Sequence, residues 1–162
     1  MHLITDKQKI GDWGEINGIK LLKKNGFTDI TDLNKIKHNF PVYDLLAKKG
    51  NTWYAFTSKT RNKFNPGDGK LNRQYNILVK KKSRYKLDKA AQLLKEKFNL
   101  NEFKKYWIAC PIDYSKKTQT FYFGDLEKTK NWSNLTLEDT YIGIKMNEEA
   151  LLTYDILGKA IF

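Results

Sequence analysis

Residues 44–61, DLLAKKGNTWYAFTSKTR, hold two short runs of apolar, aromatic and β-branched residues separated by Gly50 and Asn51. Two such runs joined by a glycine–asparagine pair are typical of a β-hairpin. An acid, Asp44, begins the first run, and Lys59 lies near the end of the second. The stretch therefore predicts two antiparallel strands that carry one carboxylate and one ammonium group.

The length of the hairpin loop decides whether these two groups can meet. A two-residue loop at 50–51 would place Asp44 opposite Thr57, and a loop at 49–50 would place it diagonal to Thr57. Side chains alternate with period two, so in both registers Asp44, Thr57 and Lys59 point to the same face. Opposite Cβ atoms lie about 5 Å apart and diagonal ones roughly 7–8 Å apart. Either register predicts a shared site, whereas a three-residue loop would separate Asp44 from Lys59.

A carboxylate beside a lysine suits the hydrolysis of a phosphate ester. The carboxylate is a ligand for Mg²⁺, which prefers oxygen donors. The bound metal polarises a phosphate and lowers the pKa of a coordinated water. A lysine can orient that water or neutralise the charge that develops. The simpler interpretation is an ordinary strand pair with a polar face, and these residues alone leave both open.

Three short motifs extend the pattern: GDWGE at residues 11–15, PVYD at 41–44 and TSK at 57–59. Together they resemble the core of the PD-(D/E)XK nuclease superfamily, which includes many restriction enzymes and Holliday junction resolvases. That family places an acid at the end of one strand, an acid–any–lysine triplet on the next strand, and often a glutamate on the preceding helix. The resemblance covers roughly residues 10–110.

The resemblance implies a restriction-endonuclease-like α/β fold, with a mixed central sheet flanked by helices and a single nuclease-like domain over residues 1–162. It implies Mg²⁺ or Mn²⁺ as cofactor, with Asp44, Glu15 and the carbonyl of Ser58 as metal ligands. Lys59 would position the attacking water or stabilise the scissile phosphate.

Thr57 departs from the family pattern, because it occupies the catalytic position where the family has Glu, Asp or sometimes Gln. A neutral hydroxyl is a poorer metal ligand than a carboxylate. Three explanations compete: Glu15 supplies the missing carboxylate, the sequence carries an inactivating substitution, or the domain binds DNA without cutting it.

The charge balance points to a polyanionic partner. The formal net charge is +12, from 27 lysines and three arginines against 18 acids, and all three arginines lie between residues 61 and 84. An excess of this size favours nucleic acid, although a lysine-rich surface without function is the alternative. The predicted nucleic-acid-binding residues are Arg61, Lys63, Lys70, Arg73, Lys81, Lys82 and Arg84.

The remaining composition restricts the class of protein. The single cysteine, Cys110, excludes an internal disulfide and any cysteine-rich metal site. No apolar run approaches the roughly 18 residues of a membrane span, and the N-terminus lacks the apolar core of a signal peptide. We therefore expect a cytoplasmic protein without membrane association.

Periodicity predicts the other elements. A helix is expected over residues 12–25, with Trp13, Ile16 and Leu22 on its apolar face and Gly26 after its end, and a second helix over 86–98. Strands are expected at 106–111 and 118–123, and a further helix over 150–156. Residues 62–83 are expected to form a long polar loop, and a short strand at 75–79 within it is left open. The order predicts a mixed α/β domain with a central sheet.

Three functions follow from these features. The first is a metal-dependent DNA endonuclease, acting as a homodimer if both strands of a duplex are cut. The alternative is a catalytically silent nucleic-acid-binding domain on the same fold. The third is a basic protein that binds an acidic protein.

Overall fold

The computed structural model describes residues 7–78, 83–130, 132 and 142–161. Its helices and strands follow one another in this order: α1 (Lys7–Lys24), β1 (Thr28–Asp32), α2 (Leu33–Ile36), β2 (Leu45–Lys49), β3 (Thr52–Asn62), β4 (Gln74–Leu78), α3 (Ser83–Phe98), β5 (Lys104–Asp113), β6 (Thr118–Asp125), the 3-10 turn η1 (Leu126–Lys128), β7 (Ile142–Lys145), α4 (Glu148–Leu151) and β8 (Asp155–Ile161).

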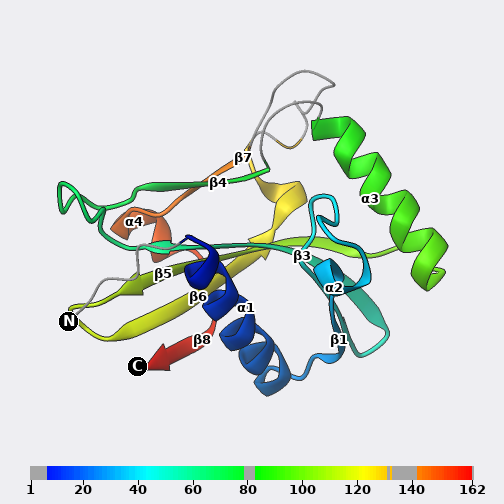
Figure 1. The fold of residues 1–162 in the computed structure, drawn as a ribbon, viewed down its shortest axis with the longest axis horizontal. Helices are drawn as coiled ribbons and strands as arrows, with labels where there is room; N and C mark the ends of the chain where they lie inside the picture. Colours follow the sequence, from blue (N-terminus) through cyan, green and yellow to red (C-terminus); the bar gives the residue numbers. More distant parts are fainter. Residues whose placement is uncertain (1–6, 79–82, 131, 133–141, 162) are drawn as a thin grey trace.

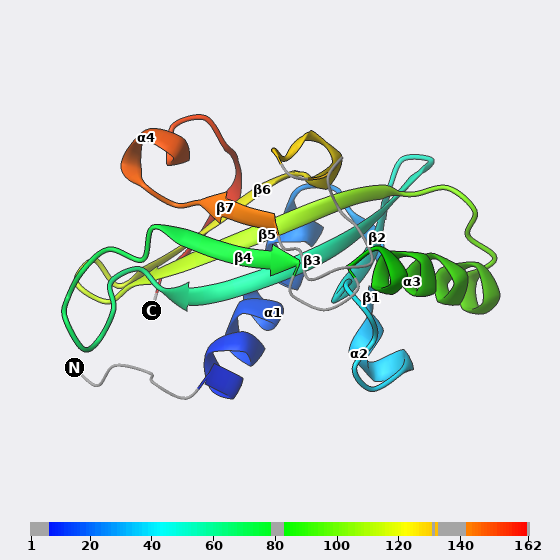
Figure 2. The same cartoon turned by 90° about the horizontal axis from the view of Figure 1, so that it is seen from above.

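A six-stranded mixed sheet forms the centre of the molecule (Figure 1). Its strand order is β1-β2-β3-β5-β6-β8; β3 and β5 are parallel and the other neighbours are antiparallel. A separate antiparallel ribbon of β4 and β7 lies over the sheet. Helix α1 and this ribbon lie on opposite sides of the sheet in Figure 2. The prediction of an α/β fold with a mixed central sheet is confirmed.

The hairpin forms in the first of the two predicted registers. Lys49 pairs with Thr52 across a two-residue loop, and Leu45 pairs with Phe56. Gly50 adopts a φ of 61°, a conformation that glycine reaches without a steric penalty. Asp44 lies just before β2, and its N–H donates to the Phe56 carbonyl at 2.8 Å. The predicted strands and their pairing are therefore confirmed.

Alternation along the strands divides the core into two clusters. Leu45 and Phe56 pack with α1, whereas Leu46 and Ala55 pack with α3 and the β4–β7 ribbon. By the same alternation, Lys59 lies on the face of Ala55. Asp44 precedes the paired residues of β2, so the strand pairing does not assign its face, and its common face with Lys59 stays a prediction.

Helix α1 ends as expected but buries a different face. The N–H of Phe27 bonds to the carbonyl of Leu22, and Gly26 has a φ of 86°, which is a Schellman ending. The expected apolar stripe is wrong in part, because Ile16 is 55% exposed. The buried face instead includes Gly14 and Gly18, which face the sheet. Glycines spaced four apart let the helix approach the strands closely.

One further prediction needs correction. The helix expected over residues 150–156 is only the single turn α4, and Asp155 already begins β8, which pairs with β6. This miss involves a strand whose partner is distant in sequence, which local periodicity does not reveal. The short strand expected at 75–79 within the 62–83 loop is confirmed as β4, which pairs with β7. In the part of the chain that the structure describes, no helix is long and apolar enough to cross a membrane.

Candidate functional site

The candidate site lies where β2 begins while β3 continues. Strand β2 pairs with β3 only between Leu45–Phe56 and Lys49–Thr52, but β3 pairs with β5 as far as Asn62. Beyond Phe56 the β2 side of β3 borders a cavity of about 1020 Å³. Its walls come from α1, α2, the segment 38–42, residues 58–61 of β3, and α3. This part of β3 has one edge open to the cavity, because β2 does not extend along it.

Asp44 is fixed at this edge by two hydrogen bonds. The backbone N–H of Ser58 donates to Oδ2 at 2.8 Å, and the side-chain amide of Asn34 donates to Oδ1 at 3.3 Å. The N–H and C=O of a strand residue point to the same edge, so the Ser58 carbonyl also faces the β2 side. Asp44 and the Ser58 carbonyl, both predicted metal ligands, are therefore brought together.

Lys59 lines the same cavity as Asp44. Burial raises the pKa of Asp44, and the hydrogen bonds from Ser58 and Asn34 and the charge of Lys59 oppose that rise. The net pKa of Asp44 remains above its usual value. The predicted carboxylate and ammonium groups thus interact electrostatically within one site.

Glu15 reaches the cavity from α1. Its pKa is raised from 4.5 to about 7, first by burial and then by the negative charges of Asp32, Asp44 and Asp12, while a hydrogen bond from the Asn34 side chain lowers it. The predicted helical acid therefore lies near the predicted strand acid, and their like charges disfavour ionisation of both.

Asn34 is a site residue that sequence reasoning missed. The turn α2 presents its amide to the Asp44 carboxylate, and Asp32 caps that turn by accepting a bond from the Asn34 N–H at 3.0 Å. The Leu33 N–H donates to the Asp44 carbonyl at 2.9 Å. The sequence Asp32–Leu33–Asn34 carries a capping signal, but only the tertiary contacts place Asn34 beside Asp44.

The donor set is compatible with Mg²⁺. No group of three or more His, Cys, Asp or Glu side chains within the described ranges is placed to hold a metal ion. Mg²⁺ commonly takes one or two carboxylates and keeps several waters. Glu15, Asp44 and the Ser58 carbonyl supply that number of oxygen ligands. A dication would stabilise the ionised carboxylates, whose pKa values are raised first by burial.

Thr57 does not contribute to the cavity wall. Its side chain is 3% exposed, its β5 partner in register is Trp107, and the cavity is lined by its neighbours Ser58 and Lys59 instead. A larger acid at this position would be buried.

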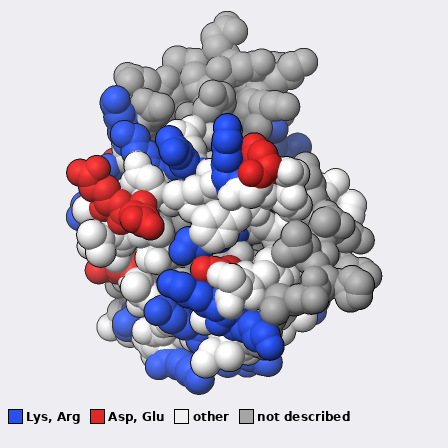
Figure 3. All heavy atoms as spheres, turned by 90° about the vertical axis from the view of Figure 1, so that its left-hand side faces the viewer, with Lys and Arg blue, Asp and Glu red and all other residues white. Residues whose placement is uncertain are grey.

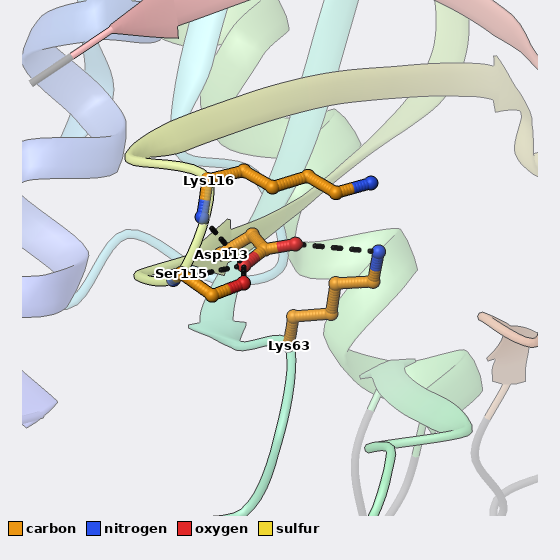
Figure 4. Close-up of polar contacts among 4 residues, drawn as sticks. All are labelled: Lys63, Asp113, Ser115 and Lys116. Carbon is orange, nitrogen blue, oxygen red and sulfur yellow. Dashed lines mark hydrogen bonds and ion pairs between the residues drawn. The ribbon is translucent and has the colours of Figure 1, made fainter.

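Of the predicted nucleic-acid-binding residues that the structure describes, only Arg61 lies at the cavity. Arg61 lines the cavity, whereas Lys63 forms an ion pair of 3.6 Å with Asp113 (Figure 4). Burial raises the pKa of Asp113, but hydrogen bonds from Ser115 and Lys116 and the charge of Lys63 lower it overall. Three others, Lys70, Arg73 and Arg84, are exposed; Lys81 and Lys82 lie outside the described residues. Figure 3 shows lysine and arginine side chains along the lower part of the end of the molecule that it faces.

Cavity residues outside the predicted site set include His38, Tyr85, Lys86 and Lys89. The last three lie on the first turns of α3. Their spacing of three and four residues is the signal that places them on one helix surface. Only the tertiary structure shows that this surface lines the same cavity as Asp44.

Comparison of the chain with protein-family models, with curated proteins and with solved structures gives no match. The function is therefore inferred from the geometry and chemistry of the cavity.

Proposed function

We propose that the protein is a metal-dependent DNA endonuclease that hydrolyses phosphodiester bonds. One observation carries the proposal: Asp44, Glu15 and Lys59 come from three different elements and line one cavity at the open edge of β3. This arrangement fits the resemblance to the PD-(D/E)XK superfamily. One acid lies on a helix, a second acid comes just before a strand, and a lysine lies on the next strand. A restriction-endonuclease-like fold is part of this proposal.

Each side chain has a distinct role. Asp44, Glu15 and the Ser58 carbonyl would hold Mg²⁺ or Mn²⁺. The metal supplies polarisation of the phosphate and a more acidic bound water. Lys59 stabilises negative charge on the scissile phosphate, and Asn34 orients the Asp44 carboxylate through its hydrogen bond.

The charge of the protein supports a polyanionic substrate. The net charge is +12, and Arg61, Lys86 and Lys89 border the cavity that holds the acids. Carboxylates alone would repel a phosphate. Cations around the site offset this repulsion and let the phosphate approach. Cleavage of both strands of a duplex would require two such sites, so a homodimer belongs to the proposal.

A second candidate function is a catalytically silent nucleic-acid-binding domain. Thr57 favours it, because this position carries no carboxylate. Three acids line the cavity, Asp12, Glu15 and Asp44, but within the described ranges no group of three such side chains is placed to hold a metal ion. The endonuclease would cut DNA and the silent domain would not, whereas both would bind it.

The deciding experiment is cleavage of supercoiled plasmid with Mg²⁺ or Mn²⁺, using the wild type, Asp44→Asn, Lys59→Met and the control Lys97→Ala on exposed α3 surface. If the protein is an endonuclease, the wild type and Lys97→Ala should produce nicked or linear DNA. Asp44→Asn and Lys59→Met should reduce the cleavage rate by at least about 100-fold. Absence of cleavage by the wild type, with DNA binding retained in EDTA, would favour the silent domain.

A further inference from the structure

An exposed aromatic ring forms part of the wall of the proposed active site. Tyr85 lies in the first turns of α3 and is 54% exposed, although it lines the cavity. Large aromatic side chains are normally buried, so an exposed ring in a concave site needs an explanation. Its neighbour in the helix, Leu87, is buried in the core and anchors this part of α3.

Cations accompany the ring. Lys86 and Lys89 line the cavity from the same helix, and Arg61 lines it from β3. A phosphate track with an aromatic ring beside it is how proteins bind single-stranded nucleic acid, since every base offers a face for stacking. In an intact duplex the base faces are stacked on one another and are closed to a protein side chain.

The ring and the cations lie on the wall of one cavity. Its volume is about 1020 Å³, and its walls include α1, the segment 38–42 and α3. Tyr85, Lys86 and Lys89 therefore lie in the same concave site as the acids.

We infer that the cavity receives single-stranded DNA, or an unpaired stretch of DNA, with one base stacked on Tyr85 while Lys86, Lys89 and Arg61 contact phosphates. The inference rests on the proposed function and names its substrate class.

The test measures binding without cleavage. Fluorescence anisotropy in EDTA compares a labelled single strand, a duplex of the same length, and a strand of the same length that contains abasic sites. The variants are Tyr85→Leu, Tyr85→Phe and the double change Lys86→Ala with Lys89→Ala; Lys97→Ala is the control. Tyr85 is exposed, and unchanged circular dichroism and melting temperature verify that each variant is folded.

The wild type should bind the single strand about ten-fold or more tightly than the duplex. Tyr85→Leu should weaken single-strand binding by about ten-fold, because stacking on an aromatic ring is lost, while Tyr85→Phe retains the wild-type affinity. The abasic strand should bind the wild type about as weakly as the intact strand binds Tyr85→Leu. Loss of both lysines should reduce the salt slope by about 1.4.

The inference would be overturned if the wild type bound the duplex as tightly as the single strand or more tightly. It would also be overturned if neither Tyr85→Leu nor the abasic sites changed the affinity for the single strand. Neither result depends on cleavage. Conversely, a wild type that prefers the single strand but leaves it intact with Mg²⁺ would overturn the endonuclease and leave the binding mode in place.

Discussion

The backbone N–H of Ser58 donates a hydrogen bond of 2.8 Å to Oδ2 of Asp44, and this contact joins the two strands that carry the candidate site. The main-chain pairing of β2 with β3 stops at Leu45 and Phe56, so the Asp44 carboxylate accepts from an N–H that has no β2 carbonyl beside it. The bond orients the carboxylate and turns the Ser58 carbonyl to the same edge. Predictions about the site start from this contact.

Asp44→Asn and Asp44→Ala should separate folding from activity. Asparagine keeps an oxygen that can accept from Ser58, so its melting temperature should stay near that of the wild type. Alanine leaves a buried N–H unpaired, which costs about 1–3 kcal/mol. Both variants should lose metal-dependent cleavage. Thermal denaturation and plasmid cleavage measure the two effects, and an active Asp44→Asn variant would remove Asp44 from the mechanism.

Glu15 should make stability depend on pH. Its pKa of about 7 in the folded protein lies above the usual 4.5, so the folded state retains a proton that the unfolded state has lost between these values. Stability is therefore lost as the pH rises from about 4.5 to 7. Glu15→Gln should be more stable than the wild type at pH 8, by about 1 kcal/mol because Glu15 is half-exposed, and equal to it at pH 4.

The same acid should link metal binding to pH. A cation near Glu15 favours the ionised carboxylate, so Mg²⁺ should raise the melting temperature of the wild type at pH 8 and have less effect at pH 6. Glu15→Gln should reduce the stabilisation by Mg²⁺ at pH 8. Calorimetric titration at the two pH values provides the measurement, and equal metal affinity at both would exclude Glu15 as a ligand.

Gly14→Ala and Gly11→Ala form a matched pair on α1. A Cβ at Gly14 would overlap the side chain of Thr60, whereas a Cβ at Gly11 would have no heavy atom within 4 Å. We expect Gly14→Ala to cost about 1–3 kcal/mol through overpacking and to displace Glu15 from the cavity. Gly11→Ala should stabilise the helix by up to about 1 kcal/mol. Urea denaturation tests both, and a neutral Gly14→Ala would show that α1 packs less closely.

Thr57→Glu tests the departure from the family pattern. The position is 3% exposed, so a buried carboxylate should lower the melting temperature without metal. Because Thr57 lies outside the cavity wall, we expect no gain of cleavage. Thr57→Val is the control for loss of the hydroxyl. Cleavage gained only with Thr57→Glu would instead support a silent wild-type domain.

Local sequence signals were sufficient for the hairpin. Gly50 and Asn51 predict a tight turn between two strands, and the structure has the first of the two registers that the sequence left open. They were not sufficient for α1, because Gly14 and Gly18 carry no hydrophobic signal and yet form the contact with the sheet. The position of Asn34 also could not be predicted, since it depends on how α2 packs beside β2.

By itself the sequence determined the mixed α/β class and the presence of the hairpin, because these follow from turn chemistry and the period of two along a strand. Only the tertiary structure decided that β3 extends past β2, that Glu15 and Tyr85 face the resulting cavity, and that Thr57 does not. Those relationships depend on the packing of α1 and α3 against the sheet. Contacts between residues far apart in the chain leave no periodic trace in a single sequence.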